Sequence, residues 1–208
     1  ARMGIFDPPK PVDSTPRENP KAGLYPARFI WLIDLGTTME SVYQKPDEFK
    51  PKHQLLLGFE LSGAKMSDGR PFMVSEKFTI TNGQWGPYCA KTSRLHDVLK
   101  SWQGWDDKQI AKLNRIPPLL GSPCFVQVQL NESKSKPGCV WSKSTNIMPL
   151  PEGMKVEDQV NECKTFACSA GADLSDAPPF LHDRIQASFE YKGQTVPKPS
   201  STNEDIPF

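Results

Sequence analysis

Several features that identify common classes of protein are missing from this sequence. It has no apolar run approaching the ~18 to 20 residues that a membrane-spanning helix needs, and no apolar signal segment near its first residues. Its five cysteines form no Cys-x-x-Cys pair and leave one over when paired, which is typical of reduced cytosolic proteins with free thiols. We therefore expect a soluble, cytoplasmic protein without membrane partners.

The residue patterns of common enzymes are also missing. No Gly-rich phosphate loop or nucleophile elbow occurs, and His53, His96 and His182 show no triad spacing. The carboxylates that a metal-dependent nuclease would need are each better explained as strand ends, turns or helix caps. They are Asp34, Asp47, Glu48, Asp68, Asp106 and Asp107. Cys163 and Cys168 with His182 fit no common zinc pattern and lack a fourth ligand. We expect no catalysis, no metal and no cofactor.

The chain has little net charge, but the charge is unevenly distributed. The formal net charge is +1, which by itself argues against a nucleic-acid binder. Residues 23–150 carry sixteen basic and eleven acidic residues, a net charge of +5, whereas residues 151–208 carry five and ten, a net charge of −5. This distribution indicates a body that contacts DNA and an acidic tail that can compete for the same groove.

Hydrophobic patterning predicts three strands in the first part of the chain. Residues 24–35 are rich in aromatic and β-branched residues, and both sets of alternate positions are apolar, so the buried face of this strand stays open. Residues 52–61 and 72–80 alternate apolar and polar side chains and are joined by a turn at 67–71, which predicts a hairpin. Its predicted inward residues are Leu55, Leu57, Phe59, Leu61, Phe72, Val74, Phe78 and Ile80, so each strand buries one face.

The pattern then changes to helical spacing and back. Residues 91–102 predict a helix, and Asp106 is the expected cap of a second, shorter one. Residues 124–130 alternate again and predict a fourth strand, and residues 139–147, after a turn at 134–138, are predicted to form a fifth. Residues 178–191 have roughly helical spacing, which predicts a final helix docked on the strands.

Three strands, a helical insertion between strands 3 and 4, and two more strands are the order expected of an OB-fold. This fold is mainly β, a five-stranded Greek-key barrel that binds oligonucleotides on its strand 2 and 3 face and adjoining loops. The expected organisation is an extended N-terminal arm over 1–22, an OB-fold single-stranded DNA-binding domain over 23–150, a C-terminal extension with a helix over 151–191, and a flexible, disordered tail over 192–208.

Outward strand positions and one loop carry the side chains that sequence-tolerant binding of single strands needs. Aromatic faces stack on bases at ~1 to 3 kcal/mol each, and cations follow the phosphates. The predicted binding residues are Arg28, Trp31, Lys52, Lys77, Trp85, Tyr88, Lys91, Arg94, Phe125, Trp141 and Lys143. Trp141 and Lys143 share one strand face, and Trp85 lies in a loop that could close over DNA. Trp102 and Trp105 are instead predicted to be core residues.

The last six residues combine two carboxylates with an apolar end that suits a basic, apolar pocket. They follow a stretch, 191–202, that is mostly small, polar or proline, which predicts a flexible tether. The predicted partner-binding tip is Glu204, Asp205, Ile206, Pro207 and Phe208. It resembles the acidic ending of bacterial single-stranded DNA-binding proteins, which closes with Ile-Pro-Phe and recruits replication and repair enzymes.

Six short motifs occur in an order that carries a further resemblance. They are Gly23-Leu24-Tyr25-Pro26-Ala27-Arg28, Asp34-Leu35-Gly36, Asp68-Gly69-Arg70-Pro71-Phe72, Leu99-Lys100-Ser101-Trp102-Gln103-Gly104, Leu120-Gly121-Ser122-Pro123-Cys124 and Met148-Pro149-Leu150-Pro151. Together they resemble a family of bacteriophage single-stranded DNA-binding proteins with an OB-fold. The resemblance implies a protein that coats single-stranded DNA during phage replication, recombination or repair, in the cytoplasm of the infected host.

Two alternatives stay open at this point. The low net charge is compatible with a phage structural or protein-interaction module built on an OB barrel, which would bind no nucleic acid. An RNA binder is the other alternative, because stacking does not distinguish ribose from deoxyribose. A single OB domain covers roughly 4 to 16 nucleotides, so coating of DNA implies cooperativity or a homo-oligomer.

Overall fold

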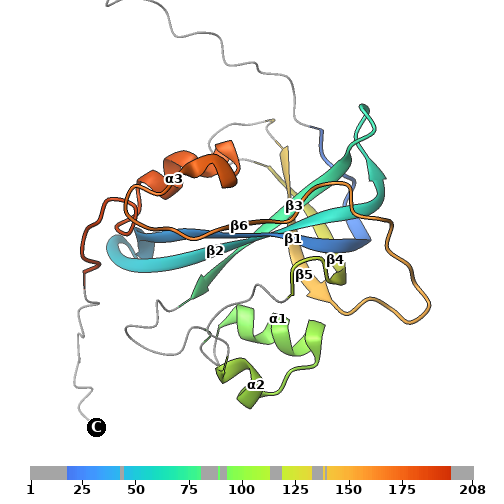
Figure 1. Ribbon diagram of the computed structural model, residues 1–208, viewed down its shortest axis with the longest axis horizontal. Helices are drawn as coiled ribbons and strands as arrows, with labels where there is room; N and C mark the ends of the chain where they lie inside the picture. The colour runs from blue at the N-terminus through green and yellow to red at the C-terminus, as the bar shows by residue number, and fades with distance from the viewer. Residues whose placement is uncertain are drawn as a thin grey trace, which may run out of the picture.

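Strands form most of the regular structure of the chain (Figure 1). A computed structural model describes residues 18–42, 45–80, 89, 93–112, 119–132, 138 and 140–197. The strands are β1 (Gly23–Val42), β2 (Lys45–Lys65), β3 (Pro71–Ile80), β4 (Pro123–Glu132), β5 (Val140–Met148) and β6 (Lys164–Phe166). The helices are α1 (Arg94–Gln103), α2 (Asp107–Ala111) and α3 (His182–Gln186), with 3-10 turns η2 (Leu174–Asp176) and η3 (Pro179–Leu181). The protein is therefore mainly β, as the alternating pattern predicts.

The six strands form one sheet in the order β3-β2-β1-β4-β5, with β6 paired to β1 outside this path. All pairings are antiparallel except that between β1 and β6. The two end strands of the path, β3 and β5, approach one another, and Ser144 Oγ of β5 donates a hydrogen bond to Glu76 Oε2 of β3 at 3.2 Å. The sheet thus curls until its two edges meet through side chains.

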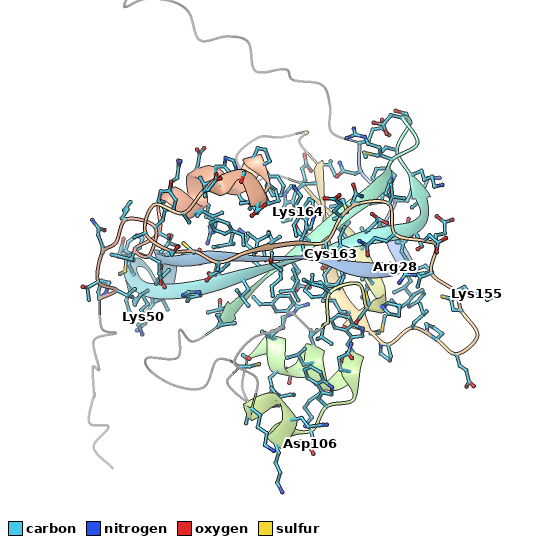
Figure 2. The ribbon with its side chains drawn as sticks, in the orientation of Figure 1. Arg28, Lys50, Asp106, Lys155, Cys163 and Lys164 are labelled. Carbon is cyan, nitrogen blue, oxygen red and sulfur yellow. The ribbon has the colours of Figure 1, made fainter. Side chains whose placement is uncertain are left out.

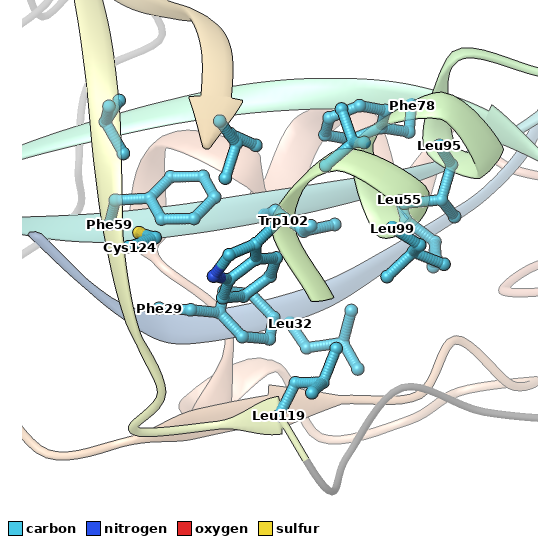
Figure 3. Packing of buried hydrophobic residues seen from close by; sticks show 14 of the residues in the cluster. Phe29, Leu32, Leu55, Phe59, Phe78, Leu95, Leu99, Trp102, Leu119 and Cys124 are labelled. Atoms are coloured by element: carbon cyan, nitrogen blue, oxygen red, sulfur yellow. The ribbon is translucent and has the colours of Figure 1, made fainter. Parts of the chain in front are cut away.

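The larger core cluster lies between the sheet and α1 (Figure 3). At its centre the ring centroids of Phe29 and Phe59 are 5.7 Å apart, and Trp102 of α1 meets Phe29 edge-on at 5.8 Å. Trp102 Nε1 donates a hydrogen bond to the Pro123 carbonyl at 3.0 Å, so its polar atom is satisfied in the core. The predictions that Phe59, Phe78 and Trp102 are core residues are confirmed.

A second core cluster lies on the opposite face of β1 and β2, beneath α3 and β6 (Figure 1). It consists of Ile33, Leu35, Leu56, Phe166, Ala177, Leu181 and Ile185. The prediction that β2 buries one face is wrong, because the segment after β5 folds back over the sheet and buries Gln54 and Glu60 as well. Both faces of β1 are buried for the same reason, which explains why both sets of its alternate positions are apolar.

Glu60 attaches the sheet to residues 151–197, which we call the returning segment. Its buried carboxylate accepts hydrogen bonds from the backbone N–H groups of Val160 and Asn161, both at 2.8 Å, and from Asn161 Nδ2 at 2.6 Å. A buried charge with three donors is well satisfied. The segment 151–197 is thus fixed along the sheet.

The final helix differs from its prediction. Instead of one helix over 178–191, a 3-10 turn over 179–181 leads into α3, which ends at Gln186. Ile185 is fully buried, whereas Phe180 is exposed.

The helical insertion agrees more closely with its prediction. Asp106 caps α2 with a capping box, in which its side chain accepts from Gln109 N and Gln109 Oε1 accepts from Asp106 N. β6 was not predicted, because three residues are too few to show alternation. None of the helices in the described part of the chain is long and apolar enough to cross a membrane.

Candidate nucleic-acid interface

An open groove of about 570 Å³ lies where β3 and β5 meet the segment that carries η3 and α3. One wall comes from the sheet and the start of α1, and the other from η3 and α3. Its functional side chains are four cations, two aromatic rings and one carboxylate, which are Lys77, Arg94, Lys143, Arg184, Trp141, Phe180 and Glu76. Four of the predicted binding residues, Lys77, Arg94, Trp141 and Lys143, are thereby brought together.

The two aromatic side chains that line the groove are both partly exposed. Trp141 of β5 is 44% exposed, and Phe180 of η3 is 57% exposed. Trp141 belongs to the wall formed by the sheet and Phe180 to the wall formed by the returning segment. Partly exposed aromatic side chains in a cationic groove are typical of sites where the bases of a single strand stack.

Two of the four cations are held by carboxylates. Arg94 Nη2 lies 2.7 Å from Glu76 Oε1 and also donates to the Thr145 carbonyl, so this side chain bridges β3 and β5. Arg184 Nη2 binds Glu40 Oε1 on the β1–β2 hairpin. Charge-assisted hydrogen bonds of this kind fix the direction of a guanidinium group. Both arginines are therefore positioned at the groove before any ligand binds.

The two lysines of the groove are less compensated. Within the described residues, no carboxylate lies within ion-pair distance of Lys77 or Lys143. The pKa of Lys77 is lowered, first because its ammonium group is desolvated and second because Arg184 repels it, while Glu40 acts in the opposite direction. An incoming phosphate would relieve this repulsion.

Glu76 is the only groove residue with an anionic side chain among those that the structure describes. Its side chain is 9% exposed. Burial raises its pKa, although Arg94, the hydrogen bond from Ser144 and Lys143 partly oppose this shift. When ionised, this carboxylate offsets part of the positive charge that faces a bound strand.

Arg28 and Trp31 lie outside the groove and make contacts within the fold. Arg28 donates to the backbone carbonyls of Glu157 at 3.0 Å and Gly121 at 3.2 Å. Trp31 is half-buried and packs against the second core cluster. Gly58 makes room for this indole, because a Cβ at Gly58 would lie 2.8 Å from the Trp31 ring. The DNA-binding roles of both residues stay predictions.

Lys52 and Phe125 are also separate from the groove. Lys52 Nζ lies 3.9 Å from Glu40 and donates to the Ser41 carbonyl at 3.4 Å, so it shares a carboxylate with the groove residue Arg184. Phe125 is half-buried on β4, opposite Pro26 of β1 and Met148 of β5. Trp85, Tyr88 and Lys91, and the tip Glu204, Asp205, Ile206, Pro207 and Phe208, lie outside the described residues.

Further cations lie along the long β1–β2 pair. Figure 2 shows Arg28 and Lys50 at opposite ends of this pair, in agreement with the register that places Arg28 beside Glu60 and Lys50 beside Glu40. Lys50 forms an ion pair with Glu48 at 3.0 Å. Lys50 is therefore more compensated than Lys77 and Lys143.

Comparison of the chain with protein-family models, with curated proteins and with solved structures finds no match. In the part of the chain that the structure describes, no three His, Cys, Asp or Glu side chains are arranged to hold a metal ion. The chemistry of the groove itself therefore carries the functional argument.

Phe180 and Arg184 were missed by sequence reasoning. They lie in the acidic terminal third, where the pattern predicts a docked helix rather than a binding surface. The Pro178-Pro179 pair before Phe180 was the available signal, since two prolines favour a turn or a helix start over the middle of a helix.

Proposed function

We propose that this chain is a single-stranded DNA-binding protein that coats and protects DNA with little sequence preference during replication, recombination or repair, as in the phage family that it resembles. The groove between the sheet and the η3–α3 segment carries this proposal. It combines two exposed rings with four cations, the side-chain types with which proteins bind single strands with little sequence preference. The tip Glu204 to Phe208 is proposed to recruit replication or repair proteins.

The strand order supports an OB-type barrel as the platform. The path β3-β2-β1-β4-β5, the approach of β3 to β5 and the helices between β3 and β4 agree with the element order expected of a five-stranded OB barrel. OB-folds bind ligands on the face of strands 2 and 3. In this protein the returning segment covers β1 and β2 on one side of the sheet. The groove lies beside this segment, over β3 and β5. We infer that a bound strand follows β3 and β5.

Titration with oligo-dT at low salt tests the proposal. Stacking on Trp141 is expected to quench tryptophan fluorescence, with binding that weakens as salt rises and with much weaker binding to duplex DNA. No quenching and no change in sedimentation with oligonucleotide would reject DNA binding in favour of a protein-interaction module. Tighter binding of oligo-rU than of oligo-dT would indicate an RNA binder.

Replacing both groove lysines, in a Lys77→Gln/Lys143→Gln variant, is expected to make binding less sensitive to salt. Each phosphate contact contributes about 0.7 to the slope of log K against log salt for single strands, so the slope should fall by about 1.4. The matched control is Lys108→Gln/Lys155→Gln, which removes the same charge from exposed positions outside the groove. An equal change in slope in both variants would mean that the groove lysines have no special role.

Affinity is expected to increase as pH falls through the pKa of Glu76. Because burial already raises this pKa, and a nearby phosphate raises it further, DNA binding should be accompanied by proton uptake at Glu76. Glu76→Gln should bind roughly fivefold more tightly at neutral pH and should lose this part of the pH dependence. Anisotropy titrations between pH 5 and pH 8 measure both effects, with Glu162→Gln as the control. An unchanged pH profile in Glu76→Gln would contradict the assignment.

A further inference from the structure

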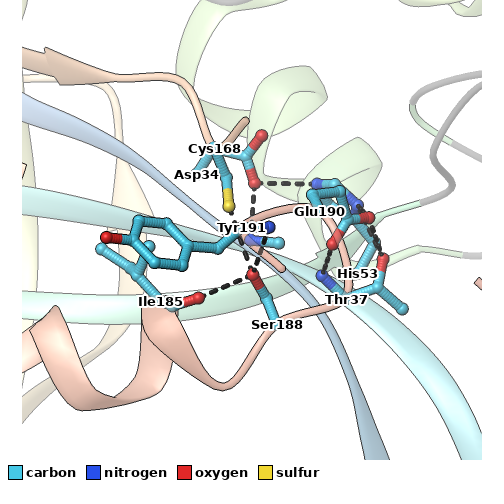
Figure 4. Close-up of polar contacts among 9 residues, drawn as sticks. Asp34, Thr37, His53, Cys168, Ile185, Ser188, Glu190 and Tyr191 are labelled. Carbon is cyan, nitrogen blue, oxygen red and sulfur yellow. Dashed lines mark hydrogen bonds and ion pairs between the residues drawn. The ribbon is translucent and has the colours of Figure 1, made fainter. Parts of the chain in front are cut away.

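Four polar side chains join the end of the returning segment to the β1–β2 hairpin (Figure 4). Glu190, four residues after α3, accepts hydrogen bonds from Thr37 N and from Thr37 Oγ1, both at 2.6 Å. His53 lies between two carboxylates, with Nδ1 3.3 Å from Glu190 Oε1 and Nε2 2.8 Å from Asp34 Oδ1. We call Asp34, Thr37, His53 and Glu190 the clasp.

The hydrogen-bond geometry of the clasp favours a charged histidine when its two acidic side chains are carboxylates. The single hydroxyl hydrogen of Thr37 goes to Glu190, so Thr37 Oγ1 can only accept from His53 Nδ1, 3.0 Å away. His53 Nε2 faces the carboxylate of Asp34, which is also an acceptor. With Asp34 and Glu190 both as carboxylates, both ring nitrogens donate, and only the imidazolium form does so.

The electrostatics agree with this geometry. Burial lowers the pKa of His53, but the hydrogen bond and charge of Asp34, followed by those of Glu190, outweigh burial and raise it. Burial raises the pKa of Glu190, but its hydrogen bonds from Thr37 and the charge of His53 outweigh burial and lower it. Cys168 lies beside Asp34 and Glu190, which raise the pKa of its thiol further after burial, so it adds no charge. The clasp is an ion pair with a well-satisfied set of donors.

Glu190 of the clasp ends the part of the chain that builds one wall of the groove. We call residues 179–190 the jaw, since they carry Phe180 and Arg184. Within the jaw, Ile185 packs into the second core cluster, and Phe189 N donates to the Thr37 carbonyl at 3.0 Å. A five-residue helix is not stable alone, so the position of α3 depends on attachments such as these.

We propose that the clasp sets the DNA affinity of the groove by holding the jaw against the sheet. The proposal rests on the proposed function and adds a positioning role for residues that lie outside the groove. Loosening Glu190 would release the jaw wall, with Phe180 and Arg184, while Lys77, Trp141 and Lys143 keep their places on the sheet. The contacts of Arg184 with Glu40 and Gln54 give the jaw a second attachment, so release would be partial.

Glu190→Gln tests the proposal, with Glu162→Gln as a matched control at an exposed position of the same segment. In the absence of DNA, hydrogen–deuterium exchange over residues 179–190 should become faster in Glu190→Gln only. Affinity for oligo-dT should fall about tenfold, the factor that corresponds to losing one charge-assisted hydrogen bond. If Glu190→Gln does not fold, Thr37→Val removes the donated hydroxyl and gives the same two readouts.

Repeating the Glu190→Gln test in a second variant protein distinguishes a positioning role of the clasp from a general loss of stability. In a Phe180→Ala/Arg184→Gln protein the jaw has lost its DNA contacts, so adding Glu190→Gln should speed exchange without weakening DNA binding further. The coupling would be overturned if Glu190→Gln also lowered DNA affinity tenfold in the Phe180→Ala/Arg184→Gln protein. It would also be overturned if Glu190→Gln alone made exchange faster but left DNA affinity unchanged. If the unaltered protein binds no oligo-dT, both the proposed function and the coupling are rejected. Hydrogen–deuterium exchange then still shows whether the clasp holds the jaw against the sheet.

Discussion

Replacing both Trp141 and Phe180 with alanine is expected to weaken the binding of oligo-dT about a hundredfold or more. Each base–aromatic stack contributes ~1 to 3 kcal/mol, and about 1.4 kcal/mol corresponds to a factor of ten in affinity. The two rings belong to opposite walls of one groove, and both are exposed, so their removal should change the fold little. Anisotropy titration with a labelled oligonucleotide measures the loss.

Phe49→Ala is the matched control for this double variant. Phe49 is 57% exposed, the same fraction as Phe180, but it lies on β2 outside the groove. Its replacement should leave affinity within about twofold, since it removes exposed apolar surface without removing a groove ring. Equal losses from Phe49→Ala and Phe180→Ala would show that exposed aromatics bind DNA wherever they lie, and would contradict a defined groove.

Gly36→Ala is expected to lower the free energy of unfolding by about 3 kcal/mol, through left-handed backbone strain and steric overlap together. Gly36 has a φ of +68°, and a Cβ there would lie 2.6 Å from Ser188 Cβ and 2.9 Å from Glu190 Oε2. The close approach of β1 to the end of the jaw therefore requires glycine. Urea denaturation followed by circular dichroism measures the change.

Gly63 offers a matched control for this substitution. Its φ is +71°, nearly that of Gly36, but a Cβ there would meet nothing within 4 Å. Gly63→Ala should lower the free energy of unfolding by only ~1 to 2 kcal/mol, the strain of an alanine in a left-handed backbone conformation. Equal losses of stability at Gly36 and Gly63 would contradict the claim that close packing of β1 against residues 188–190 requires glycine at this position.

Five of the six strands were predictable because each contains a run of seven or more residues that favour a strand, and in β2, β3 and β4 the alternation of apolar and polar residues also indicates a buried face. The second buried face of β1 and β2 was not predictable in this way. It depends on residues 151–197, where the apolar side chains are sparse and the regular elements are three to five residues long. Such a segment takes its structure from the surface that it covers, so local patterning carries little information about it.

The candidate site likewise contains residues that were predictable from strand patterns and residues that were not. Lys77, Trp141 and Lys143 were predicted from outward strand positions, and the meeting of β3 with β5 places them in one groove. Phe180 and Arg184 complete the groove only because the chain folds back, a tertiary event that their own sequence does not encode. Arg28 and Trp31 have side chains suited to binding DNA, but the returning segment contacts both of them.

Amide chemical-shift mapping with oligo-dT tests the central claim most directly, because it locates the bound strand without changing the protein. We expect shifts concentrated at Lys77, Trp141, Lys143, Phe180 and Arg184, including the indole N–H of Trp141, with little change at Lys108 and Lys155. Shifts that avoid the groove, or no shifts at saturating oligonucleotide, would contradict it.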